Sequence, residues 1–279
     1  MTALTVGALE EALFAAFPAH DAESWDRPGL AAGDRSAQVA AVAVNLDMTP
    51  QAVLAAAEAG CNVLVTHHPA FIKGGPACFA PQGDAAASGP GRLVWEAASR
   101  GVALIAMHTN ADRSLAAREA FTNLLGWSCE GSFEQYMDPA RSTQGTGFGA
   151  VYSLPQGSTL ASAAQRALEA FGGSPRVWGS PQRPVRRLAF LNGSWGEQEV
   201  YDICVRQGID CAMVGETRYH FCADAQPHLA VIDLGHDVSE LPLQRVLAQA
   251  VEQAGVPEQR IHMLECSAGN WWTPQELER

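Results

Sequence analysis

Histidines and carboxylates stand directly behind four short apolar runs of this 279-residue sequence. Side chains of these two types bind divalent metal ions, and two neighbouring ions can activate a water molecule for hydrolysis. Five of the eight histidines lie in these clusters. The residues concerned are His67 and His68 after run 61–66, His108 and Asp112 after run 102–107, His220 after run 209–214, and His236 and Glu240 after run 229–234.

The spacing within the clusters indicates two ions rather than one. Neighbouring residues at a strand end point in different directions, so His67 and His68 fit two adjacent ions better than a single ion. A separation of four residues, as between His236 and Glu240, places an imidazole and a carboxylate on one face if a helix begins there. His108 and Asp112 have the same separation. Such pairs suit borderline divalent ions, and carboxylates can bridge two of them, so the pattern predicts a hydrolytic two-metal site.

Each cluster also has a structural interpretation. A single histidine at a strand end, such as His108 or His220, is more often a hydrogen-bonded structural residue than a ligand. Glu240 alone would simply favour the start of a helix. Joint placement at successive strand ends favours the metal site, because ligands of parallel α/β sheets gather beyond the carboxyl ends of the strands. The sequence lacks a Gly-x-Ser-x-Gly motif, which argues against a serine hydrolase.

The elements that must position these clusters alternate between strands and helices. The runs 39–46, 62–66 and 102–107 are short, apolar and rich in β-branched residues, as buried strands are. Between the first two runs, Thr49, Pro50 and Gly60 are a helix cap, a first helical residue and a helix stop. This alternation predicts an α/β fold with βαβ-type units and a largely parallel sheet. We expect two lobes with the metal cleft between them at the carboxyl ends of the strands.

Composition changes along the chain predict where the lobes divide. Residues 135–149 are rich in Gly, Ser and Thr and form the best candidate boundary. We therefore expect a first lobe over 1–134, carrying His67, His68, His108 and Asp112, and a second lobe over 135–228. The strand and helix in 229–279 would return to the metal cleft. Residues 73–91, rich in Gly, Pro, Ala and Ser, predict a flap that controls access.

Charge and cysteine content exclude several classes of partner. The sequence has 18 basic and 30 acidic residues, and its net charge of −12 opposes binding to nucleic acid. No stretch of about 18 apolar residues and no signal peptide is evident, so we expect neither a membrane span nor secretion. Seven cysteines without a CxxC pair are typical of a reduced, cytoplasmic protein. A small-molecule substrate is the remaining expectation.

Five ordered segments resemble the successive motifs of the Nif-three-like, or YbgI-like, dinuclear metal family, whose members are often labelled type-two GTP cyclohydrolase I homologues. The resemblance implies a two-lobed α/β fold, a toroidal homohexamer and two divalent ions per subunit. One departure is Trp195, in a turn where the family commonly keeps a small residue. The segments are Ala22-Glu23-Ser24-Trp25-Asp26-Arg27-Pro28-Gly29-Leu30, Val65-Thr66-His67-His68-Pro69, His108-Thr109-Asn110-Ala111-Asp112, Gly215-Glu216-Thr217-Arg218-Tyr219-His220 and Gly235-His236-Asp237-Val238-Ser239-Glu240.

By motif position, the resemblance implies His67, His68, Asp112, His236 and Glu240 as metal ligands. It also implies that His108 is an extra ligand or lies at the edge of the site, and that His220 lies near the metals as a proton donor or as a residue that supports the ligands. The segment around Asp26 would organise the wall of the cleft or a subunit contact.

We expect a metal-dependent hydrolase of a cyclic amide, an N-heterocycle or a nucleotide-like small molecule. Two zinc, manganese or iron ions would polarise a carbonyl or imine and activate water, while His108 or His220 would move protons. The alternative is a non-enzymatic hexamer with a metal-binding, regulatory or scaffold role. Five or six candidate ligands are too few to saturate two ions, which favours an open, catalytic site.

Overall fold

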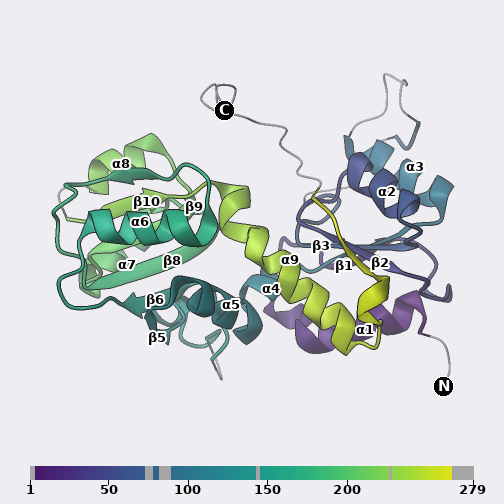
Figure 1. Cartoon of the computed structure of the whole chain (residues 1–279), viewed down its shortest axis with the longest axis horizontal. Coiled ribbons are helices and arrows are strands. Elements are labelled where there is room, and N and C mark those ends of the chain that lie inside the picture. Colours follow the sequence, from purple (N-terminus) through teal and green to yellow (C-terminus); the bar gives the residue numbers. More distant parts are fainter. Residues whose placement is uncertain (1–3, 73–77, 82–88, 143–144, 226–227, 266–279) are drawn as a thin grey trace. The chain divides into compact units, whose positions relative to one another are not determined.

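The computed structural model describes residues 4–72, 78–81, 89–142, 145–225 and 228–265. The chain divides into two compact units, each with its own β-sheet (Figure 1). The first unit contains the residues up to His108 and those from Leu247 onward, and the second contains Thr109–Val246. The expected mixed α/β fold is confirmed.

The sheet of the first unit is mostly parallel. Strands β2, β3 and β4 run parallel, as predicted, and β11 joins the edge of β2 in the same direction. Strand β1 is antiparallel to β4 and was not predicted. The order across the sheet is β1 (Gly29–Ala32), β4 (Ala103–Ala106), β3 (Val63–Thr66), β2 (Val42–Asn45) and β11 (Ile261–Met263).

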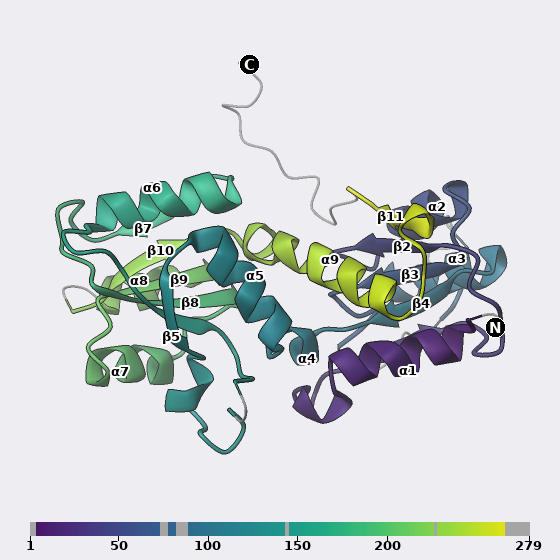
Figure 2. The ribbon, with the colours of Figure 1, turned by 60° about the horizontal axis from the view of Figure 1, so that its bottom comes forward.

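Helices cover both faces of the first sheet. Ala43, Leu64 and Leu104 are opposite one another in the register and pack with Val53 of α2 and Leu93 of α3. Figures 1 and 2 show α1 on the other face of the sheet. The helices are α1 (Val6–Ala16), α2 (Pro50–Glu58), α3 (Gly89–Arg100) and the later part of α9 (His236–Gln253).

The sheet of the second unit has a parallel centre and antiparallel edges. Strands β8, β9 and β10 run parallel, so their carboxyl ends share one edge. Strands β6 and β7 pair antiparallel with β8 and β10. The order is β5 (Ser128–Gly131), β6 (Ala150–Ser153), β8 (Arg187–Ser194), β9 (Cys211–Glu216), β10 (Ala230–Asp233) and β7 (Arg176–Trp178).

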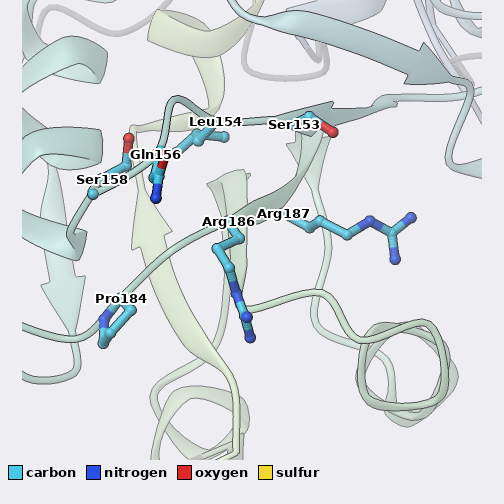
Figure 3. A pocket seen from close by; sticks show the side chains of 8 residues that line it. Ser153, Leu154, Gln156, Ser158, Pro184, Arg186 and Arg187 are labelled. Atoms are coloured by element: carbon cyan, nitrogen blue, oxygen red, sulfur yellow. The ribbon is translucent and has the colours of Figure 1, made fainter.

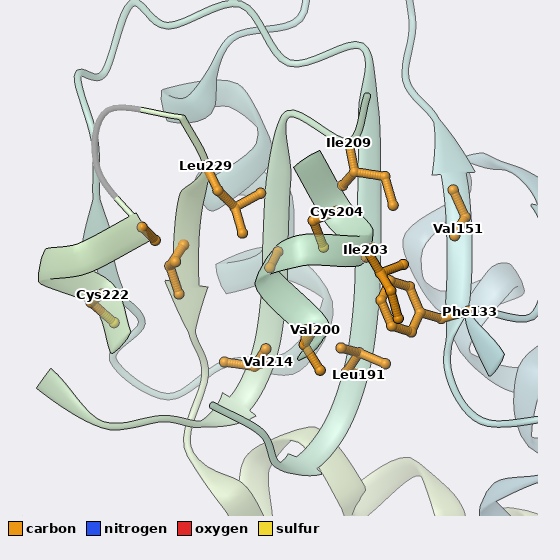
Figure 4. Packing of buried hydrophobic residues seen from close by; sticks show 14 residues of the cluster. Phe133, Val151, Leu191, Val200, Ile203, Cys204, Ile209, Val214, Cys222 and Leu229 are labelled. Atoms are coloured by element: carbon orange, nitrogen blue, oxygen red, sulfur yellow. The ribbon is translucent and has the colours of Figure 1, made fainter. Parts of the chain in front are cut away.

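Helices cover both faces of this second sheet. On one face Val200 and Ile203 of α7 pack with Val214 and Leu191 in the apolar core (Figure 4). Helix α6 covers the opposite face (Figure 2). The unit contains α4 (Thr109–Asp112), α5 (Leu115–Leu125), α6 (Leu160–Phe171), α7 (Gln198–Arg206), α8 (Tyr219–Ala225) and the beginning of α9; short 3₁₀ helices span Ala19–Asp21, Glu134–Tyr136 and Glu258–Arg260 in the chain.

The division into units differs from the lobes expected at 1–134, 135–228 and 229–279. Strand β5, inside the expected first lobe, pairs with β6 and belongs to the second sheet. The chain changes unit after His108 and again within α9, after Val246. Neither position is rich in Gly, Ser or Pro, so composition gave no sign of either change.

The six described cysteines carry no disulfide. Cys204 and Cys222 belong to the core of the second unit, and Cys61 to that of the first. Burial raises the pKa of Cys61 and of Cys222 to about 11 and that of Cys204 to about 12, so these thiols stay protonated near neutral pH. In the described part of the chain, no helix is both long and apolar enough to cross a membrane.

Candidate metal centre

Three histidines gather at one edge of the first sheet. Strands β3 and β4 are parallel neighbours, so His67 and His68 leave the sheet at the same edge as His108. One ligand nitrogen from each of the three lies within 4.8 Å of the others. Their ring centroids are 5.0 to 5.7 Å apart. This group could hold a metal ion.

Each of these imidazoles is oriented by an oxygen atom on its Nδ1 side. His68 Nδ1 lies 2.7 Å from Asp47 Oδ1, and His108 Nδ1 lies 2.8 Å from Asp26 Oδ1. His67 Nδ1 lies 3.2 Å from the carbonyl oxygen of Met107. An ionised carboxylate or a carbonyl can only accept, so Nδ1 carries the proton and Nε2 is the nitrogen that can coordinate. Metal-bound histidines characteristically have such outer partners, so the three residues fit a metal ion.

The sheet itself places the two outer carboxylates. Because β1 is antiparallel to β4, with Gly29 opposite Ala106, a residue just before β1 lies at the edge where β4 ends. Asp26 reaches His108 from there. Asp47 follows β2, the parallel neighbour of β3. The sequence had suggested only a wall or contact role for the segment around Asp26 and had not singled out Asp47.

Replacing Asp26 with Asn tests this outer shell. The change removes the negative charge beside His108 Nδ1 while keeping the size of the side chain, so we expect metal affinity to fall about 10- to 100-fold. Competition of the purified protein with a chelator measures that affinity. Asp34→Asn is the matched control, because Asp34 is exposed and caps a turn at Ser36. Equal metal affinity for both variants would show that Asp26 does not support a metal ligand.

In the second unit, the first turn of α9 pairs His236 with Glu240. The helix begins at His236, as the four-residue spacing required, and His236 Nε2 lies 3.2 Å from Glu240 Oε2. Its Nδ1 lies 3.1 Å from Glu216 Oε1, at the end of β9. Glu240 is buried, whereas Glu216 is exposed. One imidazole between two carboxylates suits zinc, manganese or iron.

Asp112, at the end of α4, is held by a residue of β8. Asn192 Nδ2 donates to Asp112 Oδ1 over 2.6 Å. The next residue, Arg113, is buried with Glu134, and its Nη2 donates to Glu134 Oε1 over 2.6 Å. The Arg113 guanidinium also lies 4.0 Å from the centroid of the Phe148 ring. The hydrogen bond from Asn192 thus fixes the Asp112 carboxylate in a position where it can bind a specific ligand.

Two glycines allow β8, β9 and α9 to approach closely. Gly193 has φ +74°, and a Cβ there would lie 2.7 Å from Glu240 Oε1. A Cβ on Gly215 would lie 2.3 Å from the carbonyl oxygen of Gly193 and 2.5 Å from Ser239 Oγ. Ser239 Oγ in turn accepts the Gly193 amide hydrogen over 3.0 Å. The carboxyl end of β8 therefore lies directly against Glu240.

His220 lies apart from these ligand groups. It is exposed on α8 and lines a pocket with Gln198 and Arg218. Among the described residues, it belongs to no group with metal-ligand geometry. Most of the flap expected at 73–91 lies outside the described residues.

These units define an α/β protein with histidine and carboxylate groups that could bind metal, at the carboxyl ends of parallel strands. A model of one family, Duf34/NIF3 (NGG1p interacting factor 3), matches residues 4–268. The chain therefore belongs to the Duf34/NIF3 family, which confirms the Nif-three-like resemblance.

Relatives of known name agree with this assignment, and a solved structure has the same fold. A protein of Clostridium acetobutylicum named "GTP cyclohydrolase 1 type 2 homolog" is 30% identical over 235 residues, which are 83% of this chain and 84% of the relative. A protein of the same name from Streptomyces coelicolor is 30% identical over 238 residues, 83% of this chain and 80% of the relative. The crystal structure of a Bacillus cereus protein related to NIF3 matches with a TM-score of 0.80 and 17% identity, covering 98% of this chain and 100% of that one.

Proposed function

We propose that this protein is a metal-dependent hydrolase in which two divalent ions are bound by His67, His68, Asp112, His236 and Glu240. The substrate would be a cyclic amide, an N-heterocycle or a nucleotide-like small molecule. We further propose that the protein acts in the cytoplasm as a homohexamer and binds neither nucleic acid nor membrane.

The observation that carries the proposal is the oriented histidine group of the first unit. His67, His68 and His108 each present Nδ1 to an oxygen acceptor, and two of those acceptors are carboxylates. This arrangement favours coordination through Nε2, and such outer partners are characteristic of histidines that bind metal.

Two further observations support the assignment of the carboxylates. The 3.2 Å contact between His236 and Glu240 supplies a neutral and an anionic ligand on one helix face. Asp112 follows His108 by only four residues, and an extended segment of that length spans at most about 14 Å. The chain itself therefore keeps Asp112 within reach of the histidine group. The names of the two bacterial relatives are compatible with chemistry on an N-heterocycle.

In this proposal the residues have distinct tasks. Ions bound there would supply Lewis-acid polarisation of a carbonyl or imine and would activate a water molecule. Asp47 and Asp26 hold the proton on Nδ1 of His68 and His108 and so fix which nitrogen faces the ion. Asn192 orients Asp112 by donating to its Oδ1. His220, exposed beside Arg218, would exchange protons with the substrate or solvent.

The second candidate is a hexamer that binds metal in a regulatory or scaffold role without turnover. Five ligands divided between two ions leave coordination positions for substrate and water, which favours the enzyme.

Turnover measurements distinguish these two candidates. They compare the metal-loaded protein, the protein stripped of metal by a chelator, and the variants. On a panel of cyclic amides, N-heterocycles and nucleotides, we expect hydrolysis by the loaded protein and a loss on the order of a thousandfold in His67→Ala and in His236→Ala. His20→Ala is the matched control, because the His20 side chain is 83% exposed. Undiminished hydrolysis by the chelated protein would exclude the metal mechanism, and a loaded protein that hydrolyses nothing would favour the scaffold.

A further inference from the structure

A hollow beside the His236 and Glu240 pair contains none of the proposed metal ligands. It lies in the second unit, where β8 and β9 end, and consists of two adjoining pockets of about 260 and 310 Å³. Both pockets are lined by Gly196 and Arg218. Glu216, which lines the smaller pocket, is the residue in contact with His236.

Arg218 is a cation without a protein counter-ion in this hollow. Its side chain is exposed, and within the described residues it makes no hydrogen bond or ion pair. Three carboxylates line the hollow with Arg218. Glu216 contacts His236, and Glu197 accepts the amide hydrogen of Gly196 over 2.9 Å. The third, Asp224, is exposed and forms no ion pair with Arg218. By contrast, other arginines of this unit are neutralised, including Arg113 by Glu134, Arg176 by Asp233 and Arg187 by Glu130.

A buried hydroxyl lies next to Arg218. Thr217 Oγ1 is inaccessible to solvent and has no hydrogen-bond partner in the described part of the chain, although Thr217 lines the smaller pocket. A Cβ on Gly196 would lie 2.7 Å from this oxygen, so only a glycine fits beside the hydroxyl at this position. A buried polar atom without a partner costs free energy, which a bound acceptor would recover.

The wall of the hollow is tied to the candidate ligands. Trp195 lines the smaller pocket, and its Nε1 donates to the carbonyl oxygen of Asn192 over 2.7 Å. The side chain of Asn192 holds Asp112. The amide of Trp195 donates to the carbonyl oxygen of Glu216 over 3.0 Å. The half-buried indole is therefore a fixed apolar wall, linked through Asn192 to Asp112 and through Glu216 to His236.

We propose that this hollow binds the anionic group of the substrate, with Arg218 and the Thr217 hydroxyl as donors to a carboxylate or phosphate and Trp195 against the ring that bears it. This inference rests on the proposed function and narrows the substrate to an anionic cyclic compound. A guanidinium forms paired, charge-assisted hydrogen bonds with either group. A chain of net charge −12 repels such a substrate at long range, so a local cation is required to hold it.

Calorimetric titration of the metal-loaded protein with inorganic phosphate and with malonate tests the proposal. We expect saturable binding of at least one anion, and an affinity at least about tenfold lower in Arg218→Gln with unchanged metal content. Arg186→Gln is the matched control. Arg186 is also exposed, has no side-chain partner among the described residues and lines a separate pocket of about 510 Å³ (Figure 3). Tighter binding of phosphate would indicate a phosphate ester, and tighter binding of malonate a carboxylate.

The same titration of the metal-depleted His67→Ala variant shows whether the anion binds in the hollow or to the metal ions. Anion binding that persists in His67→Ala and falls in Arg218→Gln supports the hollow, even if no substrate is hydrolysed and the proposed function fails. Three results would overturn the inference: no saturable binding, equal affinity of Arg218→Gln and the natural protein, or an affinity that follows metal content alone.

Discussion

Replacing Glu134 with Gln is expected to lower the free energy of unfolding by about 3–5 kcal/mol. Arg113 and Glu134 are both nearly inaccessible to solvent and share close contacts, with Arg113 Nε 3.0 Å from Glu134 Oε2. Glu134 Oε2 also accepts the amide hydrogen of Phe148 over 3.1 Å. Glutamine keeps the shape of the side chain but removes the negative charge that the buried guanidinium contacts, which is the costly step.

Urea denaturation followed by circular dichroism measures this loss. Glu169→Gln is the matched control, because Glu169 forms a 3.7 Å ion pair with Arg166 in which both side chains are substantially exposed. Such pairs contribute about 0–1 kcal/mol. Similar urea midpoints for Glu134→Gln and Glu169→Gln would mean that the buried Arg113–Glu134 pair stabilises the protein no more than the exposed pair does.

Gly215→Ala is the second change with a large expected effect. The added Cβ would lie 2.3 Å from the carbonyl oxygen and 2.6 Å from the nitrogen of Gly193, both backbone atoms that cannot rotate away. Strand β9 would have to separate from β8, at a cost of about 3 kcal/mol or more. The shift would also move Ser239, one residue before Glu240. We therefore expect lower metal content as well as lower stability.

Gly89→Ala provides the comparison for this variant. Gly89 begins α3, a Cβ there would meet no atom within 4 Å, and its φ is not positive. Alanine in a helix costs nothing relative to glycine and can stabilise it. Thermal unfolding and metal content of the two variants should therefore diverge. Equal unfolding temperatures would show that β8 and β9 tolerate a side chain at position 215.

Local sequence signals predicted the central strands and the candidate ligands because both depend on short-range pattern. Thr49 caps α2 at the expected place, and Pro50 is the first residue of that helix, as predicted. The helical spacing of His236 and Glu240 produced the contact that it predicted. Apolar runs also located the parallel strands, so the strand-end histidines could be identified before any geometry was known.

What the sequence did not reveal depends on partners that are distant along the chain. Asp26 reaches His108, 82 residues later, only because β1 is antiparallel to β4. Asp47 is a single acidic residue after a strand, with no spacing that marks it as the partner of His68. The role of Gly215 became visible only in the register between β8 and β9. Register and strand direction are properties of the whole sheet and leave little trace in local composition.

The number of ions bound per chain tests the central proposal most directly. We would measure it by elemental mass spectrometry on protein purified without chelators, for the natural sequence, His67→Ala and Glu240→Ala. We predict about two divalent ions per chain in the natural protein and a clear loss in both variants. A natural protein that binds no ion, even after reconstitution with zinc, manganese or iron, would contradict the proposal.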